Sequence, residues 1–189
     1  IEPAVAAGRV RQWFFLRYED PEPHLRVRFF GKAREMWSEV AVRVTAFARS
    51  WLRRGRIFRV QFDTYDREVE RYGGWRGLLV AERIFAVDSG SLVAVLRELR
   101  SATAIAEWHT PLLAVDGMIH AARVPLPDAI AMLGALRDSR FGAPGGGLSR
   151  RDLGRKFVEL RGEIEHLLAD AAPGSTKIHA LLDARAARL

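Results

Sequence analysis

The sequence predicts an α+β fold, in which a β-rich N-terminal part precedes a mainly helical C-terminal part. Short runs of alternating apolar and polar residues occur before residue 66, whereas helical spacing of apolar residues dominates after residue 78. The chain has 189 residues, of which 49% are hydrophobic, so it is long and apolar enough to bury a core. We therefore expect a single domain over residues 1–189.

Two strands are predicted first, and they are expected to pair as a hairpin. The stretch QWFFLRYED from Gln12 is rich in β-favouring residues and runs into the turn-rich EDPEPH. The next seven residues, HLRVRFF from His24, alternate, so their side chains should point to opposite faces. The apolar set is expected to enter a core: Leu25, Val27 and Phe29. The other face would carry three basic groups about 7 Å apart: His24, Arg26 and Arg28.

A helix and a third strand are expected next. Apolar residues recur at helical spacing between residues 32 and 54, and Gly55 stands where a helix stop is expected. RIFRVQFDTY, residues 56–65, alternates again and predicts a strand. The pair Gly73–Gly74 then permits backbone geometry that other residues resist.

The remainder is predicted to be helical. Helices are expected over 78–89 and 91–100, with Asp88 or Ser89 capping the second. Thr110-Pro111 and Pro127 are typical helix starts, because proline fits a first helical turn. A flexible GAPGGGLS, residues 142–149, precedes a long helix over 150–170. An APGS turn and a last helix, with Ser175 or Thr176 as N-cap, complete the chain.

Composition and missing motifs exclude several functions. There is no cysteine, which excludes disulfides, thiolate metal sites and thiol catalysis and fits a reducing, cytoplasmic location. The five histidines form no HxxxH or HExxH pair, and Walker-type, GxSxG and GxGxxG motifs are absent. The formal net charge of +7 comes almost entirely from arginine. A basic protein of this kind attracts anions, although a basic soluble surface explains the charge equally well.

Two groups of residues are candidates for chemistry. The basic face of the second strand also holds Phe30, and arginines beside an aromatic ring suit planar anions because a guanidinium matches a carboxylate with two parallel hydrogen bonds. A half-solvated strand with a basic outer face is the alternative. Glu68 and Arg71 share one face if their segment is helical, where a structural ion pair is the commonest explanation. The glycine pair that follows is typical of loops that border sites.

Four blocks, in chain order, resemble the C-terminal domain of lantibiotic dehydratases, a domain that also defines the stand-alone thiopeptide-type bacteriocin biosynthesis proteins. They are WFFLRY, DPEPHLRVRF, YDREVERYGG and AERIFAVDS, all within residues 13–89. The tail STKIHALLDARAARL resembles the family's closing segment, with His179 at its first histidine. Leu181, Asp183 and Ala184 stand there in place of the usual His, Asn and Arg.

The resemblance implies that the protein eliminates glutamate from glutamylated Ser or Thr of a ribosomally made precursor peptide, giving dehydroalanine or dehydrobutyrine. A separate domain or protein would add the glutamate from glutamyl-tRNA. A glutamyl ester has one free carboxylate and releases a second, so arginines suit it. The resemblance places four residues on elimination positions: Arg28, Glu68, Arg71 and His179. Three more are expected to bind substrate: His24, Arg26 and Tyr72.

As a mechanism we expect His179 to remove the Cα proton, since an imidazole titrates near neutrality. Arg28 or Arg71 would stabilise the developing charge while Glu68 orients an arginine or the substrate amine, with no metal or cofactor. The expected partners are the precursor peptide and the glutamylating domain or subunit, with a homodimer as a further expectation and no membrane.

Three alternatives stay open. Stand-alone relatives form the six-membered nitrogen ring of thiopeptides by a formal [4+2] cycloaddition, although these tend to lose the elimination residues. A non-catalytic module that binds a peptide or partner enzyme would explain the altered tail. Direct nucleic-acid binding ranks last, because there is charge but no recognition motif.

Overall fold

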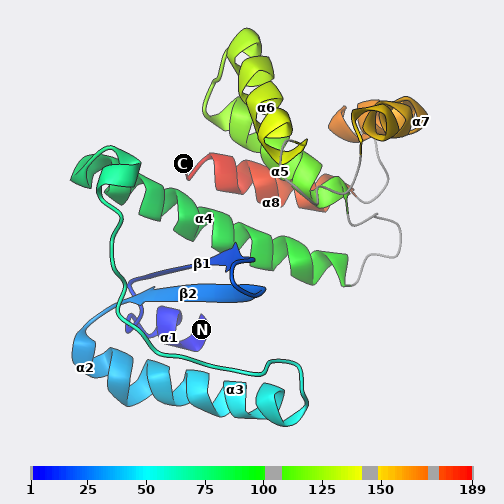
Figure 1. Ribbon diagram of the computed structural model, residues 1–189. Helices are drawn as coiled ribbons and strands as arrows, with labels where there is room; N and C mark the ends of the chain where they lie inside the picture. Colours follow the sequence, from blue (N-terminus) through cyan, green and yellow to red (C-terminus); the bar gives the residue numbers. More distant parts are fainter. Residues whose placement is uncertain (1, 101–107, 142–148, 170–174, 189) are drawn as a thin grey trace. The chain divides into compact units, whose positions relative to one another are not determined.

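The computed structural model describes residues 2–100, 108–141, 149–169 and 175–188 (Figure 1). The chain divides into two compact units, Ile1–Gly90 and Ser91–Leu189, called here the N-terminal and C-terminal units. The first holds a small antiparallel sheet with helices and the second is helical, so the predicted α+β fold is confirmed. The expectation of a single domain stays a prediction.

The predicted hairpin is present. Strand β1, Gln12–Tyr18, pairs antiparallel with β2, His24–Phe30. In this register Phe14 lies opposite Arg28 and Tyr18 lies opposite His24. The basic residues of β2 therefore share one face with Phe14, Leu16 and Tyr18 of β1.

The two faces of the hairpin are buried differently from the prediction. Leu25 and Val27, expected in a core, are 60% and 41% exposed, and only Phe29 of that set packs in an apolar cluster. On the basic face Phe14 is completely buried. The prediction was wrong because strand alternation shows which residues share a face, whereas burial depends on what packs against it.

A continuous helical stretch follows the hairpin, as predicted for residues 32–54. It consists of α2, Ala33–Glu35, the π-helical η1, Met36–Ala41, and α3, Val42–Arg53, and it ends before Gly55. Together with the N-terminal α1, Glu2–Ala6, it covers the face of the sheet that bears Trp13 and Phe29. The buried members of this cluster are Ala4, Val10 and Val40.

The predicted third strand over residues 56–65 is wrong. The described sheet has only β1 and β2, and residues 56–65 run as an irregular connection out of α3 (Figure 1). The alternating Phe58, Val60 and Phe62 are exposed. An alternating pattern makes a strand only where a neighbouring strand accepts its backbone hydrogen bonds. The pattern itself does not specify such a neighbour.

A 3-10 turn leads into one long helix. The turn η2, Glu70–Tyr72, ends at Gly73 and Gly74, whose positive φ angles of 72° and 92° suit glycine and confirm the special geometry predicted there. Helix α4 then runs from Trp75 to Leu99 without interruption, so the prediction of two helices is wrong. Gly90 continues the helix because one glycine costs only about 1 kcal/mol there.

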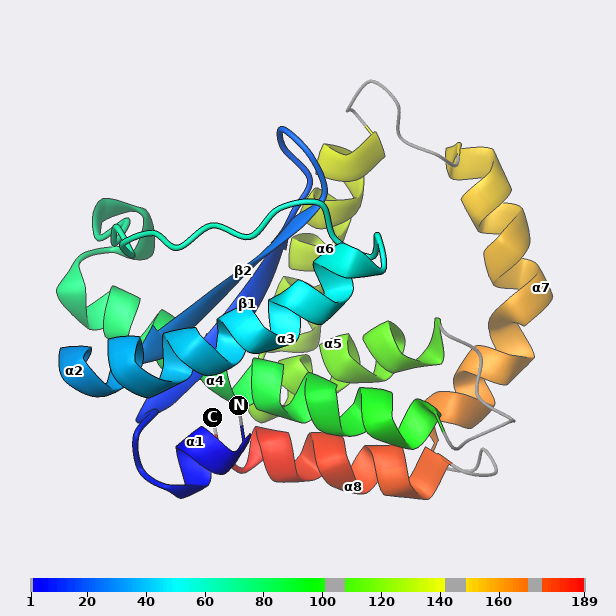
Figure 2. The same ribbon diagram turned by 90° about the horizontal axis from the view of Figure 1, so that it is seen from below.

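Helix α4 holds the free edge of β1. Ser89, expected as a helix cap, is buried inside α4, where its Oγ accepts a hydrogen bond from the Phe15 N–H at 3.0 Å. The Gln12 side chain donates to the backbone oxygen of Glu82 at 2.8 Å. Figures 1 and 2 show the hairpin between α4 and the helical stretch 33–53. The basic face is thereby held against the segment that carries the candidate residues.

The C-terminal unit contains the rest of the predicted helices. Helix α5 spans His109–Ala121 and α6 spans Leu126–Phe141, confirming the starts at Pro111 and Pro127. Helix α7, Arg150–Leu168, is capped by Ser149, and α8 spans Ser175–Ala186. Most of the expected loop 142–149 and most of the APGS turn lie outside the described residues. The unit's core consists of Val95, Leu113, Leu167, Ile178 and Leu182.

Among the helices that the structure describes, none has the length and apolar character that a membrane span requires.

The Ser89 contact predicts a local loss of stability on substitution. Ser89→Ala leaves the N–H of Phe15 without its acceptor, and we expect a loss of about 1–3 kcal/mol in the free energy of unfolding. Amide exchange at Phe15 should accelerate correspondingly when followed by NMR. Ser38→Ala, at an exposed helical serine, is the control and should leave that exchange unchanged. Equal Phe15 exchange in both variants would contradict the assigned contact.

Candidate functional site

A small pocket lies on the basic face of the hairpin in the N-terminal unit. Its space, about 10 Å³, is close to what a single water occupies. Side chains from β1, β2, the segment after α3, η2 and α4 meet there. The lining residues are Leu16, Tyr18, Arg28, Tyr65, Glu68, Tyr72 and Phe85.

Arg28 provides the positive charge of the pocket. Its guanidinium carbon lies 4.4 Å from the ring centre of Tyr65 and 5.8 Å from that of Phe14. The Nε and Nη1 atoms are buried and have no hydrogen-bond partner in the described part of the chain. A buried donor without an acceptor costs about 1–3 kcal/mol, so Arg28 is held with unused capacity for an anion.

An aromatic cluster fixes this guanidinium in place. Phe14 lies 5.8 Å from Phe30, 6.1 Å from Tyr65 and 5.4 Å from Phe85, measured between ring centres. Tyr72 in turn meets Phe85 at 5.9 Å, edge to face. These rings come from five separate segments, and their contacts set the position of the Arg28 side chain between them.

Tyr65 has a raised pKa. Burial is the largest cause, and the negative charge of Glu82 adds to it, while Arg28 acts in the opposite direction. Glu82 also accepts a hydrogen bond from the Tyr65 hydroxyl, which favours the protonated phenol further. Tyr65 is therefore a neutral hydrogen-bond donor near pH 7, not a base.

Glu82 is a buried carboxylate with its own arginine. It is 3% exposed, and the Arg67 fork donates from Nε to Oε1 at 2.9 Å and from Nη2 to Oε2 at 3.1 Å. The Arg67 guanidinium also lies 5.6 Å from the ring of Phe30 and 5.8 Å from that of Trp75. Such a bidentate pair satisfies both oxygens of a buried carboxylate.

Glu68 and Arg71 form the second acidic–basic pair. The Arg71 Nη1 donates to Glu68 Oε2 at 2.7 Å, and this bond raises the pKa of Arg71. Both side chains are largely exposed, at 52% for Glu68 and 67% for Arg71. Their contact is therefore a weak surface ion pair that opens readily.

The end of the hairpin carries a further basic cluster. The Arg26 guanidinium lies 4.1 Å from the ring centre of Tyr18, and the His24 ring stacks on the same tyrosine at 5.4 Å. Arg26 Nε donates to His24 Nε2 at 3.0 Å. Tyr18 also lines the pocket, so this cluster borders it.

The structure brings most of the predicted site residues together. Arg28, Glu68 and Tyr72 line one pocket, Arg71 is bonded to Glu68, and the His24–Arg26 pair adjoins Tyr18. His179 is different, since it belongs to α8 of the C-terminal unit and its side chain lies outside what the structure describes. Its predicted role stays a prediction.

Three residues at or beside the pocket were not found from the sequence: Tyr65, Arg67 and Glu82. All lie within the YDREVERYGG and AERIFAVDS blocks, which was the available signal. Spacing alone does not show that Glu82 is buried or which of the neighbouring arginines it binds.

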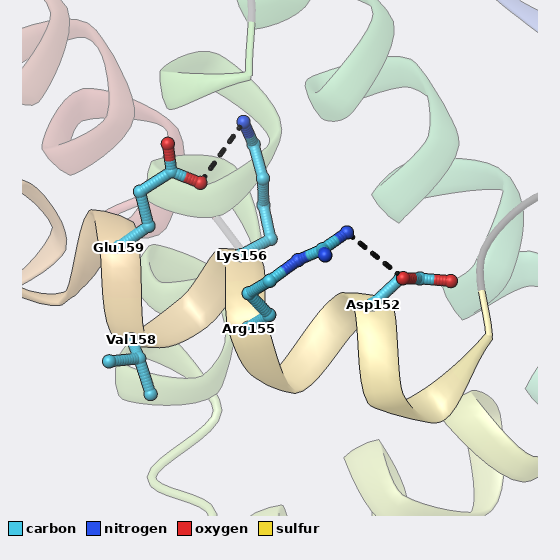
Figure 3. A pocket seen from close by; sticks show the side chains of 5 residues that line it. All are labelled: Asp152, Arg155, Lys156, Val158 and Glu159. Atoms are coloured by element: carbon cyan, nitrogen blue, oxygen red, sulfur yellow. Dashed lines mark hydrogen bonds and ion pairs between the residues drawn. The ribbon is translucent and has the colours of Figure 1, made fainter.

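A larger concavity, of about 630 Å³, lies along α7 in the C-terminal unit (Figure 3). All its lining side chains come from that helix. Its charged groups are already paired, Arg155 with Asp152 at 3.1 Å and Lys156 with Glu159 at 3.6 Å. One helix surface with paired charges offers no converging groups for a ligand, so we do not assign a site there. Among the described residues no group of three His, Asp or Glu side chains is placed to hold a metal.

The family model for lantibiotic biosynthesis dehydratase C-terminal domains matches residues 1–189. The chain belongs to this family. It is 37% identical over 84 residues to the subtilin biosynthesis protein SpaB of Bacillus subtilis and 42% identical over 77 residues to the nisin biosynthesis protein NisB of Lactococcus lactis subsp. lactis. The first match covers 44% of this chain and 8% of SpaB, and the second covers 40% of this chain and 7% of NisB.

Two solved structures share the fold. The tRNA-dependent lantibiotic dehydratase MibB of Microbispora sp. 107891 aligns over 100% of this chain and 21% of its own, with a TM-score of 0.60 and 23% identity. TsrL aligns over 99% of this chain and 58% of its own, with a TM-score of 0.61 and 17% identity. Because both identities are below 25%, these two structures support the fold of the domain and nothing further.

The environment of Tyr65 predicts a pH effect that is independent of any substrate. Tyrosines of an unfolded chain titrate at pH ~10, and the folded state holds the Tyr65 proton more tightly. The contribution of protonated Tyr65 to the free energy of unfolding is therefore complete below that pH. It is lost as the pH rises through the pKa of Tyr65 in the folded state.

Ultraviolet titration of tyrosinate checks this, because the chain has only three tyrosines. Tyr65→Phe should remove a transition above pH ~10. Glu82→Gln should move that transition to lower pH without abolishing the shift, since burial remains. A titration curve unchanged by Tyr65→Phe in that range would contradict the assigned environment.

Proposed function

We propose that this domain eliminates glutamate from glutamylated Ser or Thr residues of a ribosomally made precursor peptide. The observation that carries the proposal is Arg28, whose buried Nε and Nη1 have no acceptor in the described part of the chain, on a pocket that also holds Glu68 and Tyr72. Membership of the dehydratase family and the relatives in subtilin and nisin biosynthesis support a role in dehydration.

The reaction is a β-elimination. A base takes the Cα proton of the glutamylated residue, and the electrons of that C–H bond form the Cα=Cβ double bond. The bond between Cβ and the ester oxygen breaks, and glutamate leaves with a new carboxylate. Negative charge thus develops first near Cα and then on the leaving group, which fixed cations stabilise.

Arg28 is the group we assign to the free carboxylate of the glutamyl ester or to the departing one. A guanidinium is a planar cation that matches a carboxylate, and that of Arg28 is held by the rings of Tyr65 and Phe14, so it needs little reorganisation. The space beside it is too small for a carboxylate while Glu68 and Arg71 stay paired. We expect this exposed pair to open, so that Arg71 can meet the ligand and Glu68 can orient the substrate amine.

The remaining roles follow from position and chemistry. Tyr72 lines the pocket, and the cluster of His24 and Arg26 adjoins it, so we assign these three to substrate binding. His179 stays the candidate base. A separate glutamylating domain or protein would supply the ester, and no cofactor takes part in the proposed step.

Arg28→Ala should lower the elimination rate by ~10²-fold or more, because it removes the cation that stabilises the developing charge. The substrate is a precursor peptide with a glutamylated Ser or Thr, and mass spectrometry follows loss of glutamic acid. Arg17→Ala is the matched control, since Arg17 is an exposed arginine on the opposite face of the same hairpin.

An ester that stays intact with the wild-type protein, although the peptide binds, would contradict elimination. The same precursor peptide, carrying two dehydroalanines in place of the glutamyl ester, would then test formation of the six-membered nitrogen ring. Equal rates for Arg28→Ala and Arg17→Ala would instead remove Arg28 from the mechanism.

His179→Ala tests the predicted base separately. We expect the elimination rate to fall ~10²-fold or more and its rise through neutral pH to disappear, because a general base acts in its deprotonated form. His166→Ala is the control, since it removes another histidine from the C-terminal unit. A pH–rate profile that keeps its neutral limb in His179→Ala would assign the base elsewhere.

A further inference from the structure

The ion pair formed by Arg67 and Glu82 lies close to Arg28 in the N-terminal unit. Tyr65 joins this pair to the pocket, because its ring centre lies 4.4 Å from the Arg28 guanidinium and 5.8 Å from that of Arg67. The Arg28 guanidinium and the Arg67 guanidinium, which is bound to the buried Glu82, therefore lie against the same ring. Opposite charges in such surroundings attract strongly, and yet Arg28 Nε and Nη1 have no partner in the described part of the chain.

Arg67 explains why the attraction leaves Arg28 free. Its fork occupies both oxygens of Glu82, at 2.9 and 3.1 Å. Its position is fixed in turn by rings on three segments, with Phe30 at 5.6 Å and both Tyr65 and Trp75 at 5.8 Å. Arg67 is thus held on Glu82 by its surroundings, not only by the ion pair itself.

The other carboxylate at the pocket is occupied in the same way. Glu68 lines the pocket and accepts from Arg71 at 2.7 Å. Each carboxylate beside Arg28 thus has a different arginine as its partner. The charges of this small region are distributed so that Arg28 alone keeps buried N–H groups available to a ligand.

We propose that Arg67 is a positioning residue that sequesters Glu82 and so keeps Arg28 open to the carboxylate of the substrate. The inference rests on the proposed function for the identity of that carboxylate, but not for the sequestration itself. Without Arg67, Glu82 is a buried charge that lacks a partner. It recruits the guanidinium with free N–H groups nearby, and Arg28 becomes internally neutralised.

The proposal makes an unusual prediction about rescue. Arg67→Gln should weaken binding of an anionic ligand at Arg28 by ~10- to 100-fold, the worth of one charge-assisted contact. Adding Glu82→Gln removes the competing carboxylate, so the double variant should regain most of the binding. A purely structural role for the ion pair predicts that the double variant binds no better than Arg67→Gln.

The binding probe is a precursor peptide in which an amide replaces the glutamyl ester, so that it cannot eliminate. Its affinity for the wild type, Arg67→Gln, Glu82→Gln and the double variant is measured by calorimetry. Recovery of the double variant to within about threefold of wild type supports the proposal. Wild-type affinity in Arg67→Gln, or a double variant as weak as the single, overturns it. If Arg67→Gln does not fold, Arg67→Lys replaces it, because an ammonium lacks the fork and leaves one Glu82 oxygen open.

A second measurement needs no substrate and separates this inference from the proposed function. NMR of the arginine Nε–H groups, with Arg28→Lys to assign the Arg28 signal, reports whether that group gains an acceptor. We expect slower hydrogen exchange of Arg28 Nε–H in Arg67→Gln and its return to wild-type behaviour in the double variant. Unchanged exchange would overturn the sequestration. A wild type that fails to bind the amide peptide, with this NMR pattern intact, would count against the proposed function alone.

Discussion

Arg28 holds two buried N–H groups, on Nε and Nη1, for which the described part of the protein offers no acceptor. Each such group costs about 1–3 kcal/mol, which only the surrounding packing can offset. Phe14 supplies much of that packing, since it is fully buried and meets three other rings as well as Arg28. Placing Phe14 there requires β1 to lie against α4, which the Ser89 and Gln12 hydrogen bonds achieve. The hairpin, α4 and the segment around Tyr65 are therefore arranged about one guanidinium.

Local patterns predicted the elements that local interactions determine. The hairpin and the helix over 33–53 follow from alternation, helical spacing and Gly55, and the structure has them. The segment 56–65 has equally clear alternation but makes no strand, because its hydrogen bonds require a neighbour that the pattern does not specify. Asp88 and Ser89 indicated the start of a new helix, and α4 nevertheless continues through both. The more buried face of β2 was also misjudged, since Leu25 and Val27 are exposed while the arginine face meets the aromatic cluster.

The site was predictable to the extent that motifs name residues. Arg28, Glu68 and Tyr72 come from two sequence blocks, and they line one pocket. Neither Arg67 nor Glu82 was singled out from the sequence. Their importance depends on contacts across fifteen residues and on the burial of one carboxylate, which no spacing reveals. His179 rests on the resemblance of the tail, and its role remains a prediction.

The two acidic–basic pairs beside Arg28 differ in a way that suits different tasks. Glu82 is buried, and Arg67 binds both of its carboxylate oxygens. Loss of Arg67 would therefore leave the Glu82 charge unpaired in a region of low dielectric. Glu68 and Arg71 share one exposed hydrogen bond, and water can replace either partner at little cost. A pair that exchanges partners easily can rearrange around an arriving carboxylate, whereas a fixed pair can hold a competing charge away from it. The same two residue types thus provide a movable contact at the pocket and a permanent one beside the ring of Tyr65.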